Sequence, residues 1–306
     1  MNKIINVVSR DSELALWQTN FAIDVLRSYF PDSEFRIIST KTKGDKILDA
    51  SLSKIGDKGL FTNELEEMMR QGTADMAVHS LKDMPTALGE GLVLAGFLKR
   101  HDPRDAFLSK HSGGIMDLPE GAVVGTSSLR RRAQLLSMRP DLDVRDLRGN
   151  VNTRLRKFHE GSFDACLLAV AGLERLGLGE EISLKLNCKD FIPAVGQGVL
   201  VIEAAAERTD LRKVLESVTD QNTLRAVLAE RAFMRALEGG CQVPMGANAD
   251  IEGDTMTIRG FVGSVDGKKM LRAEMTSSES DAEALGVALA DALRAQGAQS
   301  ILDEIR

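Results

Sequence analysis

Residues 122–150 read AVVGTSSLRRRAQLLSMRPDLDVRDLRGN, and this stretch decides the fold class. A short apolar run passes through a Gly/Thr/Ser turn into a segment with helical spacing, and a second short apolar run follows. The predicted elements, extended to residue 170, are a strand at 122–125, a helix at about 128–138, a strand at 143–147, a helix at 150–159 and a strand at 164–170. Strands that alternate with helices predict an α/β unit with a parallel sheet covered by helices.

The residues before this stretch repeat the alternation in a first α/β unit. The predicted elements are a strand at 4–8, a helix from about 13 capped by Ser12, strands at 35–38, 75–79 and 92–98, and a helix at 63–71. Residues 41–60 have few apolar side chains and several Gly, Lys and Asp, so we interpret them as a mobile loop. The polar segment 99–104, which contains a proline, predicts a crossover into the second unit.

The rest of the chain defines the domain organisation. Segment 193–198 is rich in Pro and Gly, and the apolar run Val199 to Glu203 after it is expected to return to the first unit as a strand. From about residue 221 a long helix precedes three strand-like stretches and a helical C-terminus, which is α+β order. The stretches lie near 247–252, 255–263 and 269–276. We predict three domains: 1–98 with 199–216, 104–192, and 221–306.

The composition excludes several classes of protein. With 306 residues, 43% of them apolar and 27% charged, the chain is neither disordered nor fibrous. A net charge of −6 and an aromatic content of 4% argue against a basic nucleic-acid binder and against a stacking platform for bases. No apolar run is long enough for a membrane span or a secretory signal, so we predict neither.

The cysteines and histidines indicate a reducing compartment and no metal centre. Cys166, Cys188 and Cys241 are far apart and form neither a CxxC pair nor a disulfide framework, which is typical of a cytoplasmic protein. The four histidines lack metal-ligand spacing, and we interpret His79 as a packed strand residue. The GxGxxG and GxxxxGK[ST] motifs are missing from the sequence, which gives no support to dinucleotide or P-loop chemistry.

The densest charge lies in residues 130–157, which hold nine Lys and Arg residues against three Asp. Thr126, Ser127 and Ser128 stand just before it, where a strand ends and a helix begins. Arg148-Gly149-Asn150 repeats the arrangement at the next junction. Helix N-termini and hydroxyls bind anions, and the planar guanidinium of arginine matches a carboxylate. The segment therefore indicates carboxylate binding, and a solvated basic helix face is the alternative.

Two further residues are candidates for chemistry. Asp83 follows the predicted strand 75–79 at its carboxyl end, where α/β sheets bind ligands, and can stabilise a cation or handle a proton. A helix-capping role is the alternative for Asp83. Cys241 lies in EGGCQVP, a tight loop that exposes the side chain, and a thioether made from its thiolate survives reduction. The alternative for Cys241 is an inert structural cysteine, which is what we expect of Cys166.

Eight segments, in order along the chain, match the motifs of one known enzyme family. They are Ser9–Gln18, Gly59–Phe61, Ala77–Asp83, Asp102–Ala106, Gly125–Arg131, Leu147–Val151, Pro193–Gly198 and Glu238–Pro244. Through them the chain resembles the porphobilinogen deaminases, also called hydroxymethylbilane synthases, of tetrapyrrole biosynthesis. The resemblance implies two lobes like those of type II periplasmic binding proteins, with a hinge and a cleft, plus a small α+β C-terminal domain.

The resemblance also implies a reaction. Four porphobilinogen molecules are joined head to tail on a dipyrromethane cofactor held by a thioether to Cys241, ammonia leaves at each addition, and water releases linear hydroxymethylbilane. Asp83 is implied as the catalytic carboxylate that stabilises an azafulvenium cation. The residues implied to hold the cofactor are Cys241, Ser80, Lys82, Asp83, Thr126, Ser127, Ser128, Arg130, Arg131 and Arg148. Those implied to bind substrate are Arg10, Ser12, Arg148, Arg154 and, in the mobile loop, Lys54 and Lys58.

The expected protein is therefore a cytoplasmic monomer that binds a small molecule and neither metal, membrane nor nucleic acid. Two other classes fit part of the pattern. A two-lobed anion-binding sensor without catalysis needs the hinge, cleft and arginines but has no use for Asp83 or Cys241. A nucleic-acid binder using residues 130–157 predicts strongly salt-dependent binding to DNA or RNA. Neither class accounts for the eight ordered segments.

Overall fold

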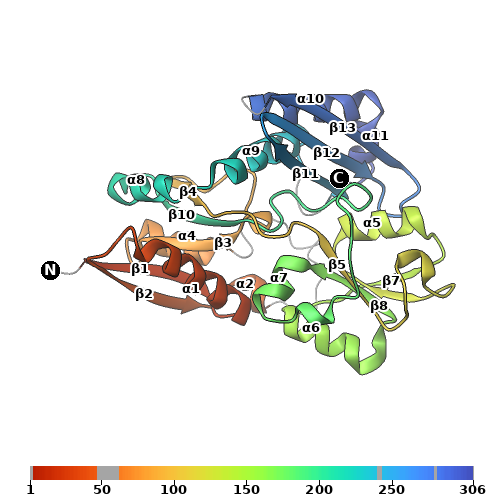
Figure 1. Cartoon of the computed structure of the whole chain (residues 1–306), viewed down its shortest axis with the longest axis horizontal. Coiled ribbons are helices and arrows are strands. Elements are labelled where there is room, and N and C mark those ends of the chain that lie inside the picture. Colours follow the sequence, from red (N-terminus) through yellow and green to blue (C-terminus); the bar gives the residue numbers. More distant parts are fainter. Residues whose placement is uncertain (1–2, 47–61, 240–242, 279–280, 306) are drawn as a thin grey trace. The chain divides into compact units, whose positions relative to one another are not determined.

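The computed structural model divides the chain into two compact units, which are described one at a time (Figure 1). Unit 1 consists of Met1–His101 and Val199–Leu224, and unit 2 of Asp102–Gly198 and Arg225–Arg306. Within these units, the structure describes residues 3–46, 62–239, 243–278 and 281–305. No helix in the described ranges is both long and apolar enough to cross a bilayer.

Unit 1 is built on a five-stranded sheet with the order β2-β1-β3-β10-β4. Its strands are β1 (Lys3–Arg10), β2 (Ser33–Thr40), β3 (Met76–Ser80), β4 (Leu92–Phe97) and β10 (Leu200–Ala205). β1 pairs in parallel with β2 and β3, whereas β10 lies antiparallel between β3 and β4. The predicted return of the Val199–Glu203 run to the first unit is confirmed. The expectation of a purely parallel sheet is wrong, because the returning strand enters from the opposite direction.

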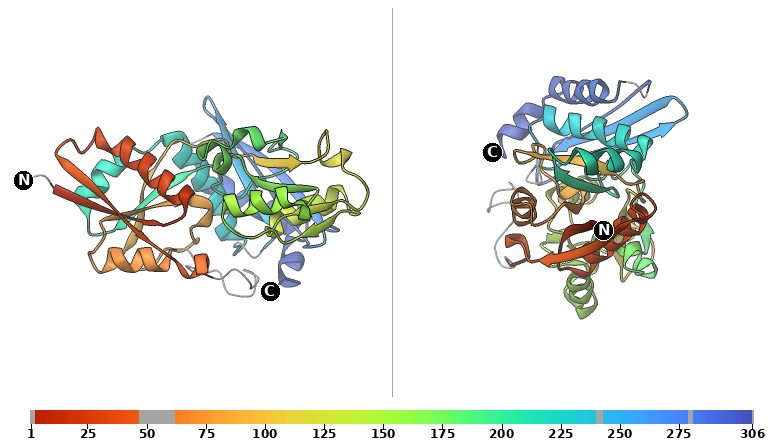
Figure 2. Two further views of the ribbon diagram at one scale, coloured as in Figure 1. Left: turned by 90° about the horizontal axis from the view of Figure 1, so that it is seen from below. Right: turned by 90° about the vertical axis from the view of Figure 1, so that its left-hand side faces the viewer.

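Helices cover both faces of this sheet (Figure 2). They are α1 (Glu13–Arg27), α4 (Asn63–Arg70) and α8 (Thr209–Ser217), and the unit also contains the short helix α2 (Lys43–Lys46) and the 3-10 turn η1 (Leu81–Asp83). Val7 and Val78 pack in one apolar cluster with residues of α1 and α8, and Val8 and Ala77 pack in another with residues of α4. Side chains alternate between the faces of a strand, so neighbours in sequence reach opposite sides. α2 occupies the start of the segment predicted to be a loop.

Unit 2 contains a second five-stranded sheet, with the order β7-β6-β8-β5-β9. Its strands are β5 (Asp105–Ser109), β6 (Val123–Gly125), β7 (Asp143–Arg145), β8 (Ala165–Ala169) and β9 (Leu184–Lys185). β6 pairs in parallel with β7 and β8, and β5 runs antiparallel to β8 and β9. The two sheets therefore share one topology. In each sheet one inner strand is antiparallel to its neighbours. This strand, β10 in the first sheet and β5 in the second, comes directly after the chain has passed from one unit to the other.

Short helices accompany this second sheet. They are η2 (Ile115–Asp117), α5 (Leu129–Met138), α6 (Val151–Lys157), η3 (Phe158–Ser162), α7 (Val170–Arg175) and η4 (Gly179–Glu181). The predicted helix at 150–159 is confirmed as α6, which changes into the π-helical turn η3. The sequence pattern did not predict β5, β9, α7 or α8.

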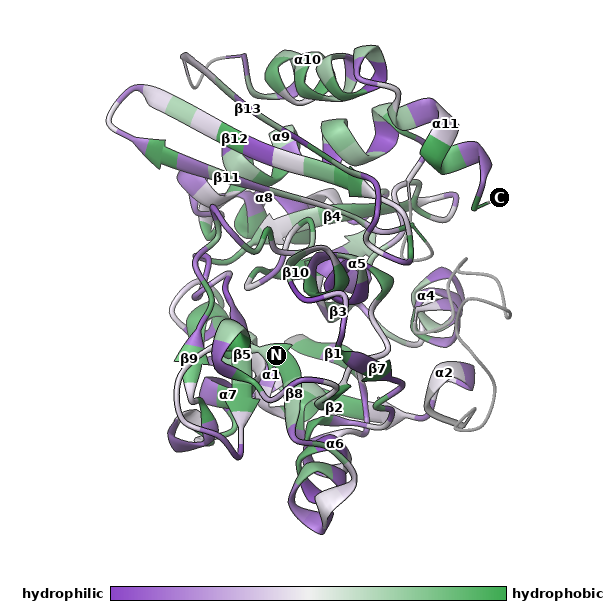
Figure 3. Cartoon of the chain, turned by 90° about the vertical axis from the view of Figure 1, so that its right-hand side faces the viewer, coloured by the Kyte–Doolittle hydropathy of each residue, from purple (hydrophilic) through white to green (hydrophobic). Residues whose placement is uncertain are grey.

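A three-stranded antiparallel sheet forms the C-terminal part of unit 2. It consists of β11 (Met245–Glu252), β12 (Thr255–Gly263) and β13 (Met270–Ser278), accompanied by α9 (Gln221–Ala236), α10 (Ala282–Ala295) and α11 (Ala298–Asp303). Ala247 and Ile258 of the sheet pack with Phe233 of α9 and Leu289 of α10. Hydrophobic and hydrophilic residues alternate along β12 (Figure 3). The predicted α+β order is confirmed, and the division into three domains stays a prediction.

The turn between β12 and β13 presses against α5. Gly267 in this turn has φ +72°, and a Cβ atom there would lie 2.5 Å from the Ser137 nitrogen and 2.7 Å from the Ala133 carbonyl oxygen. Because both atoms belong to helix backbone, Gly267→Ala is expected to lower the free energy of unfolding by at least about 3 kcal/mol. Gly253→Ala is the matched control, since Gly253 has φ +60° but open space around its Cβ position. For Gly253→Ala we expect a loss of only about 1–2 kcal/mol, which comes from backbone strain. If urea unfolding gave equal losses of free energy for Gly267→Ala and Gly253→Ala, the turn would not press on α5.

Candidate functional site

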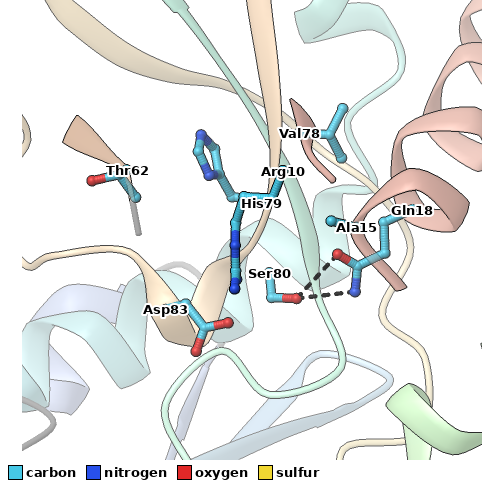
Figure 4. Close-up of a pocket in the computed structure, with 8 residues that line it drawn as sticks. All are labelled: Arg10, Ala15, Gln18, Thr62, Val78, His79, Ser80 and Asp83. Atoms are coloured by element: carbon cyan, nitrogen blue, oxygen red, sulfur yellow. Dashed lines mark hydrogen bonds between the residues drawn. The ribbon is translucent and has the colours of Figure 1, made fainter. Parts of the chain in front are cut away.

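A small pocket in unit 1 lies at the carboxyl ends of β1 and β3 (Figure 4). Arg10 ends β1, Ser80 ends β3, and Asp83 follows in η1. Parallel strands bring these side chains to one edge of the sheet, where α/β proteins bind ligands. The cavity volume is about 30 Å³, room for about one or two water molecules. Its lining residues are Arg10, Ala15, Gln18, Thr62, Val78, His79, Ser80 and Asp83.

The polar wall of the pocket joins Ser80 to Gln18. The Gln18 amide places Nε2 3.1 Å and Oε1 3.4 Å from the Ser80 hydroxyl oxygen (Figure 4). Ser12 caps α1 as predicted, because its Oγ accepts the Ala15 backbone N–H at 3.4 Å, and its role in substrate binding stays a prediction. Neither Ser12 nor Lys82 is among the described residues that line the pocket. The structure thus brings together Arg10, Ser80 and Asp83 from the predicted set.

The Asp83 carboxylate is exposed at the pocket. η1 carries it there, anchored by the buried Leu81, whose backbone N–H donates to the Val199 carbonyl oxygen at 3.0 Å. Among the described residues, none donates a hydrogen bond or forms an ion pair with Asp83. It ends the 3-10 turn and caps no helix there, so the capping alternative receives no support. An unpaired carboxylate remains available to a ligand cation.

His79 is a buried strand residue, as predicted. It is 7% exposed, and its Nε2 lies 3.0 Å from Oε2 of Glu203 in the neighbouring strand β10. Glu203 is 0% exposed. Sequence reasoning missed Glu203, and the available signal was a single acidic residue inside the apolar run of residues 199–205.

The predicted strand-to-helix junction in unit 2 is confirmed as the turn from β6 to α5, and anion binding there stays a prediction. Ser128 caps α5, because its Oγ accepts the Arg131 backbone N–H at 3.4 Å. The Thr126 hydroxyl accepts the Ser128 backbone N–H at 3.2 Å, and the Ser127 hydroxyl donates to the Leu147 carbonyl oxygen at 3.1 Å. Thr126 and Ser128 therefore keep O–H donors for an anion, whereas the Ser127 proton is already engaged.

Arg130 and Arg131 turn into the interior of unit 2 and share one carboxylate. Both are 6% exposed, and Asp105, the first residue of β5, is 0% exposed. Arg130 donates to the two Asp105 oxygens at 2.7 and 3.1 Å, and Arg131 donates twice to Oδ1 at 2.7 and 3.0 Å. Burial raises the pKa of Asp105, but the charges of both arginines outweigh it and hold that pKa well below its ordinary value. The three side chains together carry one net positive charge.

At the second junction, Arg148 lies just before α6 and Arg154 lies within it. Asn150 caps α6 by accepting a backbone N–H of the first turn at 2.9 Å. Arg154 Nε donates to the Gly149 carbonyl oxygen at 2.7 Å, and Lys157 Nζ donates to the Arg148 carbonyl oxygen at 3.2 Å. Both arginines are half-buried. The repeated junction predicted from the sequence is thus present in the same unit.

Three predicted site residues, Cys241, Lys54 and Lys58, lie outside the described residues. Cys166 is 0% exposed, and burial raises the pKa of its thiol to about 12, which fits the inert structural role expected of it. Within the described ranges, no group of three or more His, Cys, Asp or Glu side chains could hold a metal ion.

Comparisons with known proteins identify the family of this chain. Two family models match: "Porphobilinogen deaminase, dipyromethane cofactor binding domain" over residues 5–213, and "Porphobilinogen deaminase, C-terminal domain" over residues 224–295. A curated porphobilinogen deaminase from Carboxydothermus hydrogenoformans is 48% identical over 306 residues, which is 100% of this chain and 98% of that protein. The solved structure of the methionine binding protein MetQ aligns with a TM-score of 0.45 and 11% identity, covering 70% of this chain and 89% of that one. The aliphatic sulphonate binding protein SsuA from Escherichia coli gives 0.43 and 14%, covering 78% and 71%. From the family models and the full-length relative, the chain belongs to the porphobilinogen deaminase family.

Proposed function

We propose that the chain carries out the reaction of its family at the Asp83 pocket. The chain is a transferase with hydroxymethylbilane synthase activity: it joins four porphobilinogen molecules head to tail, releases ammonia at each addition and hydrolyses the linear product from the protein. One observation carries the placement of the site. Asp83 is an exposed carboxylate, without a described partner, in a pocket that also presents the guanidinium of Arg10. A sensor that only bound anions would gain nothing from such a carboxylate.

Asp83 acts by charge. When the substrate loses ammonia, a positive charge develops on its pyrrole ring. Ionised Asp83 stabilises that charge more than it stabilises the neutral ring, and only such a difference lowers the barrier. Arg10 and the Ser80 hydroxyl supply cationic and neutral donors for the substrate's acetate and propionate groups. The pocket thus offers donors to the carboxylates and a counter-charge to the reacting ring.

The donor chemistry of unit 2 fits an acidic cofactor. Thr126 and Ser128 keep hydroxyl donors, and Arg148 and Arg154 lie at the second junction. The Arg130–Arg131 pair adds one net positive charge after its pairing with Asp105. Burying carboxylates without such partners costs several kcal/mol for each ion. When bound, the dipyrromethane supplies the ring carbon to which the first substrate is joined. We assign its anchor to Cys241 and its carboxylates to these donors, with Lys82 assisting.

Intact mass under denaturing conditions tests the anchor. The protein is expected to be heavier than its sequence by two pyrrole units, located on the peptide that contains Cys241. Cys241→Ser should lose this excess mass because a serine hydroxyl is a far weaker nucleophile than a thiolate. Cys188→Ser is the matched control and should keep it.

Two outcomes would count against the anchor. Pyrrole that stays attached in Cys241→Ser would place the thioether elsewhere. A wild-type mass equal to the bare sequence, unchanged after addition of porphobilinogen, would contradict the cofactor and return the chain to the sensor class.

We further propose a cytoplasmic monomer of three domains, with Lys54 and Lys58 helping to bind substrate. The scattered cysteines support the cytoplasmic location, and the net charge of −6 argues against nucleic acid as a partner. Gel filtration should give an apparent mass near the sequence mass of 33.3 kDa. Binding to DNA that weakens steeply with salt would favour the nucleic-acid alternative instead.

A further inference from the structure

The wall of the Asp83 pocket contains a buried acid–imidazole pair that the mechanism above does not use. Glu203 is 0% exposed and holds His79 through one oxygen, Oε2, at 3.0 Å. Its other oxygen, Oε1, is buried and has no hydrogen-bond partner among the described residues. His79 lines the pocket together with Asp83 and Arg10. The imidazole is therefore the one described group that compensates this carboxylate, and it connects the carboxylate to the pocket.

The surroundings of the pair are apolar on the face of the sheet that α4 covers. Glu203 lies opposite Ala77 in the β3–β10 ladder, and Ala77 packs with Leu65 of α4. Charged groups on the packed elements include Arg10 at the end of β1, Lys82 and Asp83 in η1, and the buried Glu66 of α4. The Glu66 carboxylate is already 2.7 Å from Arg70. A positive charge on His79 is therefore balanced directly by the Glu203 carboxylate, while Arg10 and Asp83 are the other charged residues that line the pocket.

We propose that His79 and Glu203 are positioning residues that take over the proton which Asp83 collects at each addition. A buried carboxylate behind an imidazole fixes the ring with Nε2–H toward the carboxylate and leaves Nδ1 as a proton acceptor. The ring carbon that forms the new C–C bond loses its proton, and the electron pair stays in the ring. The proton passes to the Asp83 carboxylate, then through a water molecule in the pocket to Nδ1 of His79. It leaves with the released ammonia as an ammonium ion.

This relay rests on the proposed role of Asp83. One carboxylate cannot stabilise the substrate cation and hold the released proton at the same time. Asp83 stabilises the substrate cation only while it is ionised, so a proton on it removes the counter-charge. Transfer to His79 restores the ionised form, and Glu203 balances the imidazolium that results. Because each product needs four additions, Asp83 has to be restored repeatedly during one turnover.

His79→Gln and Glu203→Gln test the relay with porphobilinogen as substrate. The glutamine amide nitrogen takes the place of imidazole Nε2, so His79→Gln keeps a donor for Glu203 and removes Nδ1. We expect kcat to fall about 10²-fold, the low end for acid–base catalysis, with KM unchanged. The double variant should be no slower than either single one, because residues that act as a unit are not additive. Added buffer bases should restore the rate of His79→Gln, more strongly as their pKa rises, and leave the wild type unchanged.

A readout that does not depend on turnover comes from nitrogen-15 NMR of the histidine side chains. With four histidines in the chain, the Nε2 proton of His79 should be identifiable by its loss in His79→Gln. We expect it to exchange slowly with water in the wild type and faster in Glu203→Gln. Fast exchange in the wild type would contradict the buried pair.

Glu66→Gln is the matched control for general damage to this face of the sheet. Glu66 is 4% exposed and paired with Arg70, so its loss should lower the unfolding midpoint and leave kcat unchanged. His79→Gln with wild-type kcat, or losses that multiply in the double variant, would overturn the relay. If Glu203→Gln does not fold, His79→Gln and its buffer response remain decisive. A wild type that does not consume porphobilinogen would contradict the proposed function instead.

Discussion

Asp83→Asn is expected to lower kcat by at least about a thousandfold while leaving the fold intact. The amide has the shape of the carboxylate but no negative charge, so the cation formed on loss of ammonia loses its counter-charge. A thousandfold loss corresponds to about 4 kcal/mol of transition-state stabilisation. Stability should change little, because none of the described residues hydrogen-bonds to Asp83 and its side chain is exposed. The donors for the substrate carboxylates remain, so KM should change far less than kcat.

Steady-state kinetics with porphobilinogen, together with urea unfolding and intact mass, check this expectation. The mass shows whether the variant still carries two pyrrole units, which separates loss of chemistry from loss of the cofactor. Asp32→Asn is the matched control, an exposed aspartate of unit 1 between α1 and β2. Near-normal kcat in Asp83→Asn would remove Asp83 from the mechanism.

Asp105→Asn is expected to lower the free energy of unfolding by about 3–5 kcal/mol, the usual cost of breaking a buried ion pair from one side. Two guanidinium groups, each 6% exposed, lose their shared counter-charge and repel each other. We also expect the variant to carry less than the full amount of cofactor, because Asp105 holds both arginines beside the helix that Ser128 caps. A single substitution is therefore expected to lower both the stability of the protein and its cofactor content.

The pH dependence of this loss has a definite sign. The pKa of Asp105 is lower in the folded protein than its ordinary value of 3.8, so its stabilisation is fully present above 3.8 and fades as the pH falls toward the folded-state pKa. The difference in free energy of unfolding between the wild type and Asp105→Asn should be constant from pH 5 to 8 and become smaller below about pH 4. Asp141→Asn is the control, since Asp141 also pairs with an arginine, Arg139, but at the surface. Equal destabilisation by the two variants would contradict the account of the buried cluster.

Local patterns in the sequence were sufficient for most helices and for strands whose apolar runs stand alone. The strand β10 was predicted because the apolar residues 199–202 follow a Pro/Gly segment. β5 was not predicted, because it is five residues long and begins with the charged Asp105 directly after a polar segment. Strand direction was also beyond reach. The direction of an inner strand depends on the end of the sheet at which the chain enters, and the alternation of helices and strands in the sequence contains no information on that end.

The site divides in the same way. Asp83 could be predicted from the sequence pattern, because it follows an apolar strand at the edge where α/β sheets bind ligands, whereas Arg10 and Ser80 were implied by the family resemblance. The burial of Arg130 and Arg131 could not be predicted, because a basic run on a helix has the same local pattern whether it faces solvent or a carboxylate from another strand. Asp105 and Glu203 each act through partners far away in the chain. Long-range pairing of that kind has no local signature.

The position of β10 inside the first sheet has a consequence for how the protein forms on the ribosome. The strands of the second sheet all lie between residues 105 and 185, so that sheet can close as soon as this segment has left the exit tunnel. The first sheet cannot be completed until residues 200–205 have been synthesised, because β10 lies between β3 and β4. We therefore expect the second sheet to form before the first during synthesis. A nascent chain that stalls before β10 exposes two open strand edges to chaperones and lacks the carboxylate that holds His79.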